Sequence, residues 1–69
     1  MKLKNNLKEL RKERGLTQAS LAEMAEVSRK TINTVENGVF IPSTVLALSI
    51  AKKLGTSVEE IFYLKEEND

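Results

Sequence analysis

Helix-ending and helix-capping residues alternate along this chain, and their spacing allows only short helices. Glycines stand at the ends of three helix-periodic stretches, at Gly15, Gly38 and Gly55. Ser or Thr residues suited to cap a following helix stand at Thr17, Ser28, Ser43 and Ser57. Because glycine often ends helices and Ser and Thr side chains cap them, the sequence predicts helices at about 6–14, 17–25, 28–38 and 43–55, and a short fifth helix from residue 57.

The two ends of the chain are expected to form a short two-stranded antiparallel sheet. Residues 1–5 alternate Lys with Leu3, as a strand does, and the apolar residues 62–64 could pair with them. The predicted fold class is therefore all-α, with this small sheet added. The helix at 43–55 is apolar on nearly all sides, so we expect it to be the central buried helix.

Length and composition exclude several classes of function. The chain has 69 residues, which predicts a single domain, 1–69. A chain this short buries only about 60% of the surface that its unfolded form exposes, so a dimer partner would stabilise it. It has no Cys and no His, which excludes most zinc sites and the commonest catalytic base. We therefore expect no enzyme activity, no metal and no cofactor.

Apolar residues are distributed as in a protein that does not enter membranes. No stretch of the chain approaches the roughly 18 consecutive apolar residues of a membrane span. The N-terminus also lacks the apolar segment of a secretory signal. We therefore expect a cytoplasmic protein with no membrane partner.

The net charge of +1 conceals an uneven distribution of charged side chains. Residues 1–30 carry eight basic and four acidic side chains, for a net charge of +4. Residues 31–69 carry three basic and six acidic side chains, for a net charge of −3. Ordinary surface charge is one interpretation. The other is a local basic face, which matters more for nucleic-acid binding than the total charge does.

The predicted third helix has an apolar face and, opposite it, a polar arc without a carboxylate. At about 100° per residue, the inner face holds Ile32 and Val35 and the outward arc holds Lys30, Asn33, Thr34 and Asn37. Asn and Thr are weaker helix formers than the usual surface residues, so a plain solvated surface explains them poorly. Such side chains bind phosphates and base edges, and the arc is typical of a helix that lies in a DNA major groove.

A turn of about three residues separates the predicted second and third helices, as in a helix-turn-helix. The stretch LTQASLAEMAEVSRKTINTVENG, residues 16–38, resembles the Cro/phage-repressor type of helix-turn-helix, the XRE family. The matching pieces are Leu16-Thr17-Gln18, Leu21-Ala22, Val27-Ser28, Thr31-Ile32, Glu36-Asn37-Gly38, Pro42-Ser43 and Leu54-Gly55. The resemblance covers residues 6–62 and implies a five-helix lambda-repressor-like DNA-binding domain, with a C-terminal dimerisation and tail segment at 61–69.

The resemblance also implies which residues contact double-stranded DNA. Base-reading positions fall on Arg29, Lys30, Asn33 and Thr34. Phosphate-binding positions fall on Gln18, on Ser28 (which serves chiefly as a helix cap) and on Asn37 with the backbone that follows it. Arg or Lys would favour guanine, and Asn would favour adenine.

Two arginines share a face of the first predicted helix with core residues. Arg11 and Arg14 follow Leu7 and Leu10 at helical spacing, and an Arg beside core residues needs a carboxylate partner. The resemblance implies that Arg11 pairs with Glu36. We expect this ion pair to be structural rather than catalytic.

Two positions depart from the pattern of the family. Glu26 stands in the turn where relatives often have Gly, which costs about 1 kcal/mol or more if that residue is left-handed. Val39 and Phe40 stand where many relatives have basic residues. Part of the expected attraction for phosphates is therefore missing after the third helix.

Apolar residues near the C-terminus exceed what one short helix can bury, which predicts a homodimer interface. They are Val58, Ile61, Phe62, Tyr63 and Leu64. The alternative is that they complete the core of a single chain. A two-fold dimer would place two third helices about 34 Å apart, on a pseudo-palindromic operator.

Two classes of function remain open. With no recognisable ligand-binding or activating domain, the simplest regulator is a repressor that occludes a promoter. The alternative is an antitoxin or anti-repressor, in which Phe40, Val45 and the tail bind another protein. Only three aromatic residues are present, which argues against the stacking surface of an RNA-binding module.

Overall fold

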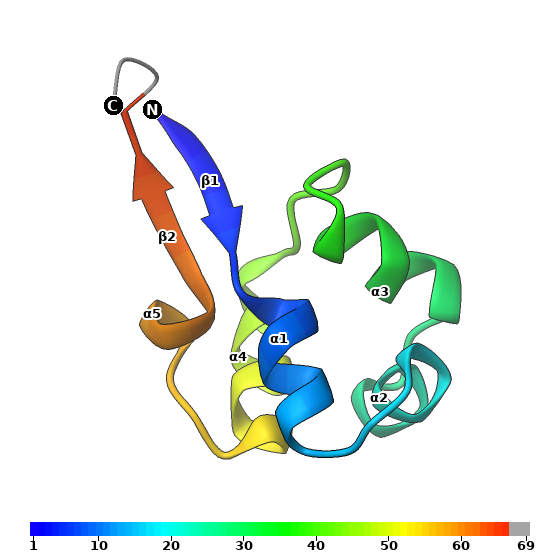
Figure 1. Cartoon of the computed structure of the whole chain (residues 1–69). Coiled ribbons are helices and arrows are strands. Elements are labelled where there is room, and N and C mark those ends of the chain that lie inside the picture. Colours follow the sequence, from blue (N-terminus) through cyan, green and yellow to red (C-terminus); the bar gives the residue numbers. More distant parts are fainter. Residues whose placement is uncertain (67–69) are drawn as a thin grey trace.

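Five helices and a two-stranded sheet make up the computed structural model, which describes residues 1–66 (Figure 1). In chain order the elements are β1 (Lys2–Asn5), α1 (Leu7–Glu13), α2 (Gln18–Ala25), α3 (Arg29–Glu36), α4 (Thr44–Leu54), α5 (Val58–Ile61) and β2 (Phe62–Lys65). The five predicted helices are confirmed, with ends at most two residues inside the predicted ranges. The end of the predicted tail, 67–69, lies outside the described residues.

Side-chain caps start four of the five helices. Each capping oxygen accepts a hydrogen bond from the backbone N–H three residues later, and the capping residues are Thr17, Ser28, Ser43 and Ser57. A cap of this kind stabilises a helix by about 1 kcal/mol. At the start of α1, Asn5 takes this role, because its Oδ1 accepts from the backbone N–H of Leu7 at 3.0 Å.

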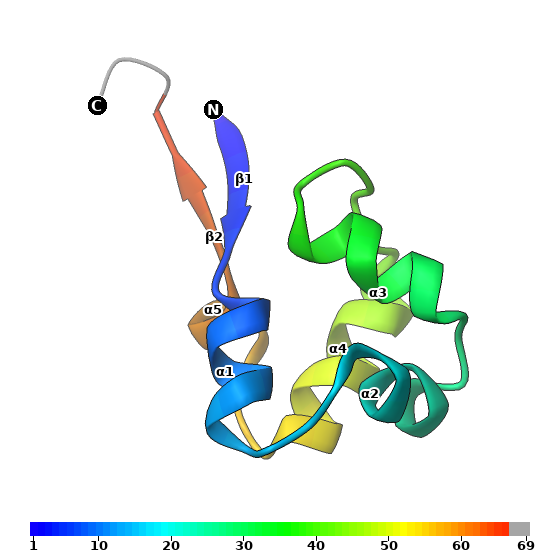
Figure 2. The ribbon, with the colours of Figure 1, turned by 45° about the vertical axis from the view of Figure 1, so that its right-hand side comes forward.

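The two chain ends pair as an antiparallel sheet, which confirms the predicted strand pairing. β1 and β2 lie side by side and extend away from the helices (Figures 1 and 2). Leu3 lies opposite Leu64, and Asn5 lies opposite Phe62. The Nδ2 group of Asn5 also donates a hydrogen bond to the carbonyl oxygen of Val35 at 3.0 Å. This bond holds β1 beside the C-terminal end of α3.

Aliphatic side chains from all five helices form one core. The largest fully buried ones are Leu7, Leu21, Ile32, Val35, Ile50 and Ile61. Four alanines, two on α2 and two on α4, are also buried. Because these side chains are small, α2 packs closely against α4 while it also packs against α3. The helix-turn-helix, α2 and α3, therefore packs on α4 and shares one core with the rest of the domain.

α4 is buried on one side only, which corrects the prediction of a central buried helix. Its buried residues are Ala47, Ile50, Ala51 and Leu54. Val45 and Leu48 face away from the core, with 78% and 57% of their surface exposed. The few remaining elements of so short a chain cannot cover every side of an 11-residue helix. An apolar surface is therefore left open on α4.

Candidate nucleic-acid interface

A left-handed residue joins α2 to α3. Glu26 has φ 58° and ψ 42°, and it is the one residue other than glycine with positive φ in the part of the chain that the structure describes. Its backbone N–H and that of Val27 both donate to the carbonyl oxygen of Ala22, which closes the turn as a glycine would. A side chain in this conformation costs about 1–2 kcal/mol, so the turn retains a strained residue.

α3 presents its polar side to solvent and its apolar side to the core. Ile32 and Val35 are buried, with at most 1% of their surface exposed. The exposed residues of α3 are Arg29, Lys30 and Asn33, and Asn37, which directly follows the helix, is exposed as well. The two cationic side chains lie in the first turn, where a helix that enters a DNA groove brings side chains to base edges.

Two of the predicted contact residues have their hydroxyl groups engaged within α3. The Oγ1 group of Thr34, which is partly buried, donates to the carbonyl oxygen of Thr31 at 3.0 Å. The Oγ atom of Ser28 accepts from the backbone N–H of Thr31 at 3.1 Å and also pairs with the Thr31 hydroxyl. Thr34 therefore has its methyl group and the acceptor side of its hydroxyl oxygen left to offer to DNA, and Ser28 acts as the helix cap.

The ion pair between Arg11 and Glu36 lies beneath this surface. The Nε group of Arg11 donates to Oε2 of Glu36 at 2.6 Å, and the two side chains are 8% and 2% exposed. The Nη1 group of Arg11 donates to the carbonyl oxygen of Leu16 at 2.8 Å. The second arginine of that face, Arg14, has a different partner, because its Nε group donates to the carbonyl oxygen of Leu54 at the end of α4.

Hydrogen bonds lead from this ion pair to the polar face of α3. The Nε2 group of Gln18, the first residue of α2, donates to Oε1 of Glu36 at 3.0 Å and to Oδ1 of Asn33 at 3.1 Å. The Nδ2 group of Asn37 donates to the same Oδ1 of Asn33 at 3.3 Å. Gln18, Asn33 and Asn37, all predicted to contact DNA, are thus joined in one network. This network could not be predicted from the spacing of the residues in the sequence.

The backbone after α3 is already hydrogen-bonded within the domain. The N–H groups of residues 37–40 donate to carbonyl oxygens of Asn33, Thr34 and Val35. They are therefore not available to hold a phosphate in this conformation. The phosphate clamp at Asn37 stays a prediction, and in this conformation the side chain of Asn37 is the donor that could serve it.

The predicted dimer residues divide into two groups. Ile61 is 0% and Phe62 is 8% exposed, so both belong to the core of the single chain and offer no surface to a second copy, contrary to the prediction. They are buried because α5 and β2 pack the chain end onto the helices. Val58 is partly buried against the same core, whereas Tyr63 and Leu64 are 44% and 63% exposed.

An apolar groove that the sequence did not predict lies on the face of the sheet that carries Leu3 and Leu64. It has a volume of about 280 Å³ and is lined by residues that include Leu48, Val58 and Phe62. The signal in the sequence was the excess of apolar residues around α4. Within residues 1–66, no helix has the length and apolar character needed to cross a membrane, and no side chains cluster as metal ligands would.

Comparison with known proteins supports the helix-turn-helix assignment. The family model described as Helix-turn-helix (HTH_3) matches residues 7–61. The HTH-type transcriptional regulator YgzD of Bacillus subtilis is 42% identical over 96% of this chain and 100% of its own length. An HTH-type transcriptional regulator of Methanothermobacter thermautotrophicus is 48% identical over 88% of this chain and 90% of its own. The competence pilus inhibition repressor of Acinetobacter baylyi is 38% identical over 87% of this chain and 54% of its own.

Solved structures with the same fold include regulators and one enzyme. The restriction-modification controller protein C.AhdI of Aeromonas hydrophila superposes with a TM-score of 0.75, at 35% identity over 78% of this chain and 82% of its own. A SinR/SinI protein complex gives 0.72, at 30% identity over 77% of this chain and 52% of that one. The hydroxypropylphosphonic acid epoxidase of S. wedmorenis gives 0.72, at 29% identity over 78% of this chain.

The extent of each match separates the enzyme from the regulators. This chain spans only 29% of the epoxidase chain, so the likeness is restricted to a minor part of that enzyme. By contrast, it spans nearly all of the two HTH-type regulators above. Together with the capped helices, the left-handed turn and the two-faced α3, these matches show that the chain belongs to the HTH_3 family of XRE-type helix-turn-helix transcriptional regulators, with the lambda-repressor-like fold.

Proposed function

We propose that the protein is a sequence-specific DNA-binding repressor that places α3 in the major groove of an operator. The observation that carries this proposal is the outward face of α3, which exposes Arg29, Lys30 and Asn33. The one carboxylate of α3, on Glu36, is turned inward and paired with Arg11. The exposed face is therefore cationic and amide-bearing, as base and phosphate recognition requires.

Each contact residue has a role that its surroundings support. Arg29 and Lys30 would read guanine. Asn33 would read adenine once DNA displaces one of the two hydrogen bonds that its Oδ1 accepts from Gln18 and Asn37. Thr34 would contact a thymine methyl group through its own methyl group, because the hydrogen of its hydroxyl is already donated to Thr31. These four positions would supply the sequence preference of the protein.

Phosphate contacts would flank these base contacts. Gln18 opens α2, and the first N–H groups of a helix lack partners within it, so an anion there is favoured by the helix dipole as well. The side-chain amide of Gln18 donates to Asn33 and Glu36, so it would release one of these bonds to bind the phosphate itself. Asn37 would bind a second phosphate through its side chain. Ser28 would add a contact only through the lone pair that its capping bond leaves over.

We also propose that two copies bind a pseudo-palindromic operator. One recognition helix makes few base contacts, whereas a two-fold dimer places two of them about one helical turn apart. The surface proposed for the dimer is the apolar strip formed by Leu48, Val58 and Leu64, of which Leu48 and Leu64 are exposed and Val58 is partly buried. Tyr63 lies opposite Lys4 and therefore on the other face of the sheet. A stable interface buries about 1,200–2,000 Å². A strip that spans α4, α5 and β2 would contribute apolar area to such an interface.

The name of one relative supports repression as the direction of control. The A. baylyi relative is called a repressor. A domain that binds an operator within a promoter excludes polymerase without any further activity. Repression is therefore the simplest consequence of operator binding by this domain.

Selection of bound duplexes from a random double-stranded DNA pool, at near-physiological salt, tests the proposal. We expect enrichment of an inverted repeat whose half-sites are centred about one helical turn apart. Binding that is equal for all sequences and falls steeply with salt would reduce α3 to a generic basic face. Enrichment of a single half-site would support base reading and contradict the dimer.

A protein-interaction role, as in an antitoxin or anti-repressor, is the second candidate. It is favoured by the exposed apolar run between α3 and α4, where Val39, Phe40 and Ile41 are 78%, 46% and 71% exposed. The complex of SinR with SinI shows that a protein of the same fold can bind a protein partner. A purified partner that still binds after Phe40→Ser would exclude this surface.

A further inference from the structure

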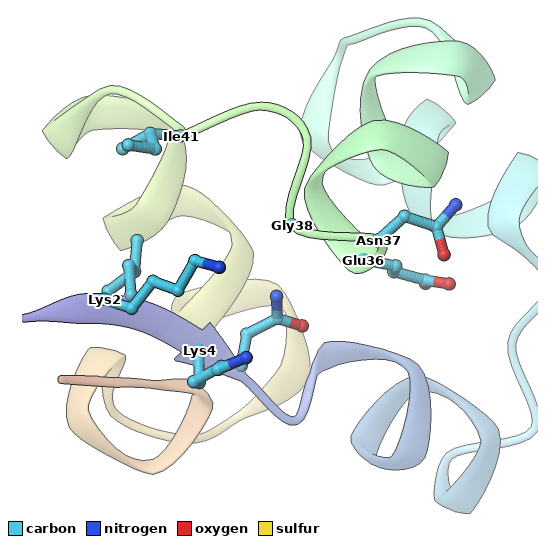
Figure 3. Close-up of a pocket in the computed structure, with 8 residues that line it drawn as sticks. Lys2, Lys4, Glu36, Asn37, Gly38 and Ile41 are labelled. Atoms are coloured by element: carbon cyan, nitrogen blue, oxygen red, sulfur yellow. The ribbon is translucent and has the colours of Figure 1, made fainter. Parts of the chain in front are cut away.

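A groove with two lysines lies between β1 and the end of α3. Its volume is about 410 Å³, and its walls include Lys2 and Lys4 from β1 and Asn37, Gly38 and Ile41 from the other side. In Figure 3, the side chains of Lys2 and Lys4 extend from the strand on the side of the groove that faces Asn37 and Gly38. Residues about 35 positions apart in sequence thus form one cationic surface.

The strand is held so that both lysines stay on this surface. Side chains alternate along a strand, so Lys2 and Lys4 share one face, whereas Leu3 packs against the core. The hydrogen bond from Asn5 to the carbonyl oxygen of Val35 ties the end of β1 to α3. The spacing between the lysines and Asn37 is therefore set by the fold and not by a free N-terminal arm.

The acidic wall of the groove does not cancel this charge. Glu36 also lines the groove, but its side chain is 2% exposed and is paired with Arg11. The ion pairs among residues 1–66 are Arg11 with Glu36 and Arg14 with Glu13, so Lys2 and Lys4 take part in neither. Two ammonium groups therefore remain available to an anion.

Little else near the end of α3 could attract a DNA strand. Residues 31–51 contain no Lys and no Arg. The backbone N–H groups of residues 37–40 are already hydrogen-bonded inside the domain. A phosphate near Asn37 would therefore meet one neutral amide from α3 and, across the groove, the two lysines of β1.

We propose that Lys2 and Lys4 bind the DNA phosphates next to the one bound by Asn37, so that β1 forms a backbone-binding element beside the helix-turn-helix. The inference rests on the proposed function and adds a site to it. These contacts would position the domain and would not alter which bases it reads.

The salt dependence of binding counts such contacts. Each phosphate neutralised contributes about 0.9 to the slope of log K against log salt for duplex DNA. The variant Lys2→Gln/Lys4→Gln should therefore have a slope smaller in magnitude by about 1.8. Its affinity should fall alike for operator and random duplexes. Unfolding midpoints should match those of the wild type, because both side chains are exposed.

A matched control removes the same charge elsewhere. Lys52 and Lys53 lie in the last turn of α4, at the end of the domain remote from β1 (Figures 1 and 2). The variant Lys52→Gln/Lys53→Gln should keep the slope of the wild type. Ethylation interference should then locate the phosphates that the β1 variant no longer binds, and these should be next to the phosphate that Asn37→Ala no longer binds.

The outcomes distinguish a failure of this inference from a failure of the proposed function. A wild type that selects an operator, with a β1 variant whose slope equals that of the control, would overturn the phosphate site and leave the repressor proposal intact. A changed base preference in the β1 variant would also overturn it. A wild type that binds no duplex would overturn both proposals.

Discussion

Arg11 on α1 and Glu36 at the end of α3 form an ion pair with 2.6 Å between Nε and Oε2, almost out of reach of solvent. The pair ties the first helix to the helix that carries the proposed base-reading residues. α3 contributes only Ile32 and Val35 to the buried core. The ion pair therefore helps to fix the orientation of α3, because the small apolar face of this helix does not fix it alone.

Removing one partner of this pair should destabilise the domain strongly. Glu36→Ala leaves the Arg11 guanidinium buried without its carboxylate, and a loss of about 3–5 kcal/mol is expected. Urea unfolding monitored by circular dichroism measures the change. The double variant Arg11→Met/Glu36→Leu should lose less than the sum of the two single variants, because no charge is left unpaired. A single variant that loses less than about 1 kcal/mol would contradict the structural role.

Replacing the strained turn residue should stabilise the domain. Glu26→Gly removes a left-handed non-glycine residue and should raise the free energy of unfolding by about 1 kcal/mol. In a domain of this size, that raises the melting temperature by about 4–8 °C. Glu26→Ala is the matched control, because it removes the charge and keeps the strain. Equal gains for Gly and Ala would assign the effect to charge.

Local signals in the sequence were sufficient for the helices and the strands. Ser28 caps the start of α3 and Gly55 ends α4, and each affects only the adjacent turn of its helix. These two helix ends could therefore be predicted from the sequence. The exposed side of α4 could not, because it depends on how many other elements cover Leu48. The burial of Phe62 likewise follows from strand pairing, which decides the face that each side chain takes.

The site was predictable as a list of positions but not as a network. Helical geometry placed Lys30 and Asn33 on the outward arc, where the structure has them. The bond from Gln18 to Asn33 joins two helices, and the approach of Lys4 to Asn37 joins a strand to a helix. Such contacts depend on tertiary packing, which residue spacing within one element does not contain.

The two cationic residues at the start of α3 should control base preference. Arg29→Ala or Lys30→Ala should weaken operator binding by about 1–3 kcal/mol and should weaken binding to random duplexes less. Titrations of both duplexes at one salt concentration measure the difference. Lys12→Ala, on the exposed part of α1, is a charge-matched control. Equal losses on both duplexes would exclude base reading by these residues.

The first residue of α2 should affect all sequences alike. Gln18→Ala removes the proposed phosphate contact and is expected to lower affinity for operator and random duplexes by the same factor. Asn33→Ala should instead change preference at a single base pair. Because Gln18 also donates to Asn33 at 3.1 Å, a change confined to that same base pair would show that Gln18 positions Asn33 and does not bind phosphate.

The last prediction concerns the surface of the dimer. Leu64 is 63% exposed on β2, so Leu64→Glu should keep the fold and place a charge in the proposed interface. Sedimentation should then report a monomer, whereas the wild type is expected to sediment as the proposed dimer, and binding to the inverted repeat should fall more than binding to one half-site. Phe62→Glu would be a poor test, because Phe62 is in the core and the variant would unfold.

A charge of the same kind outside the strip provides the control. Val39 is 78% exposed in the segment between α3 and α4, so Val39→Glu adds the same carboxylate without altering Leu48, Val58 or Leu64. We expect this variant to sediment as the wild type does. If Leu64→Glu also remained a dimer, the interface would lie elsewhere; if both variants became monomers, added negative charge rather than the apolar strip would control association.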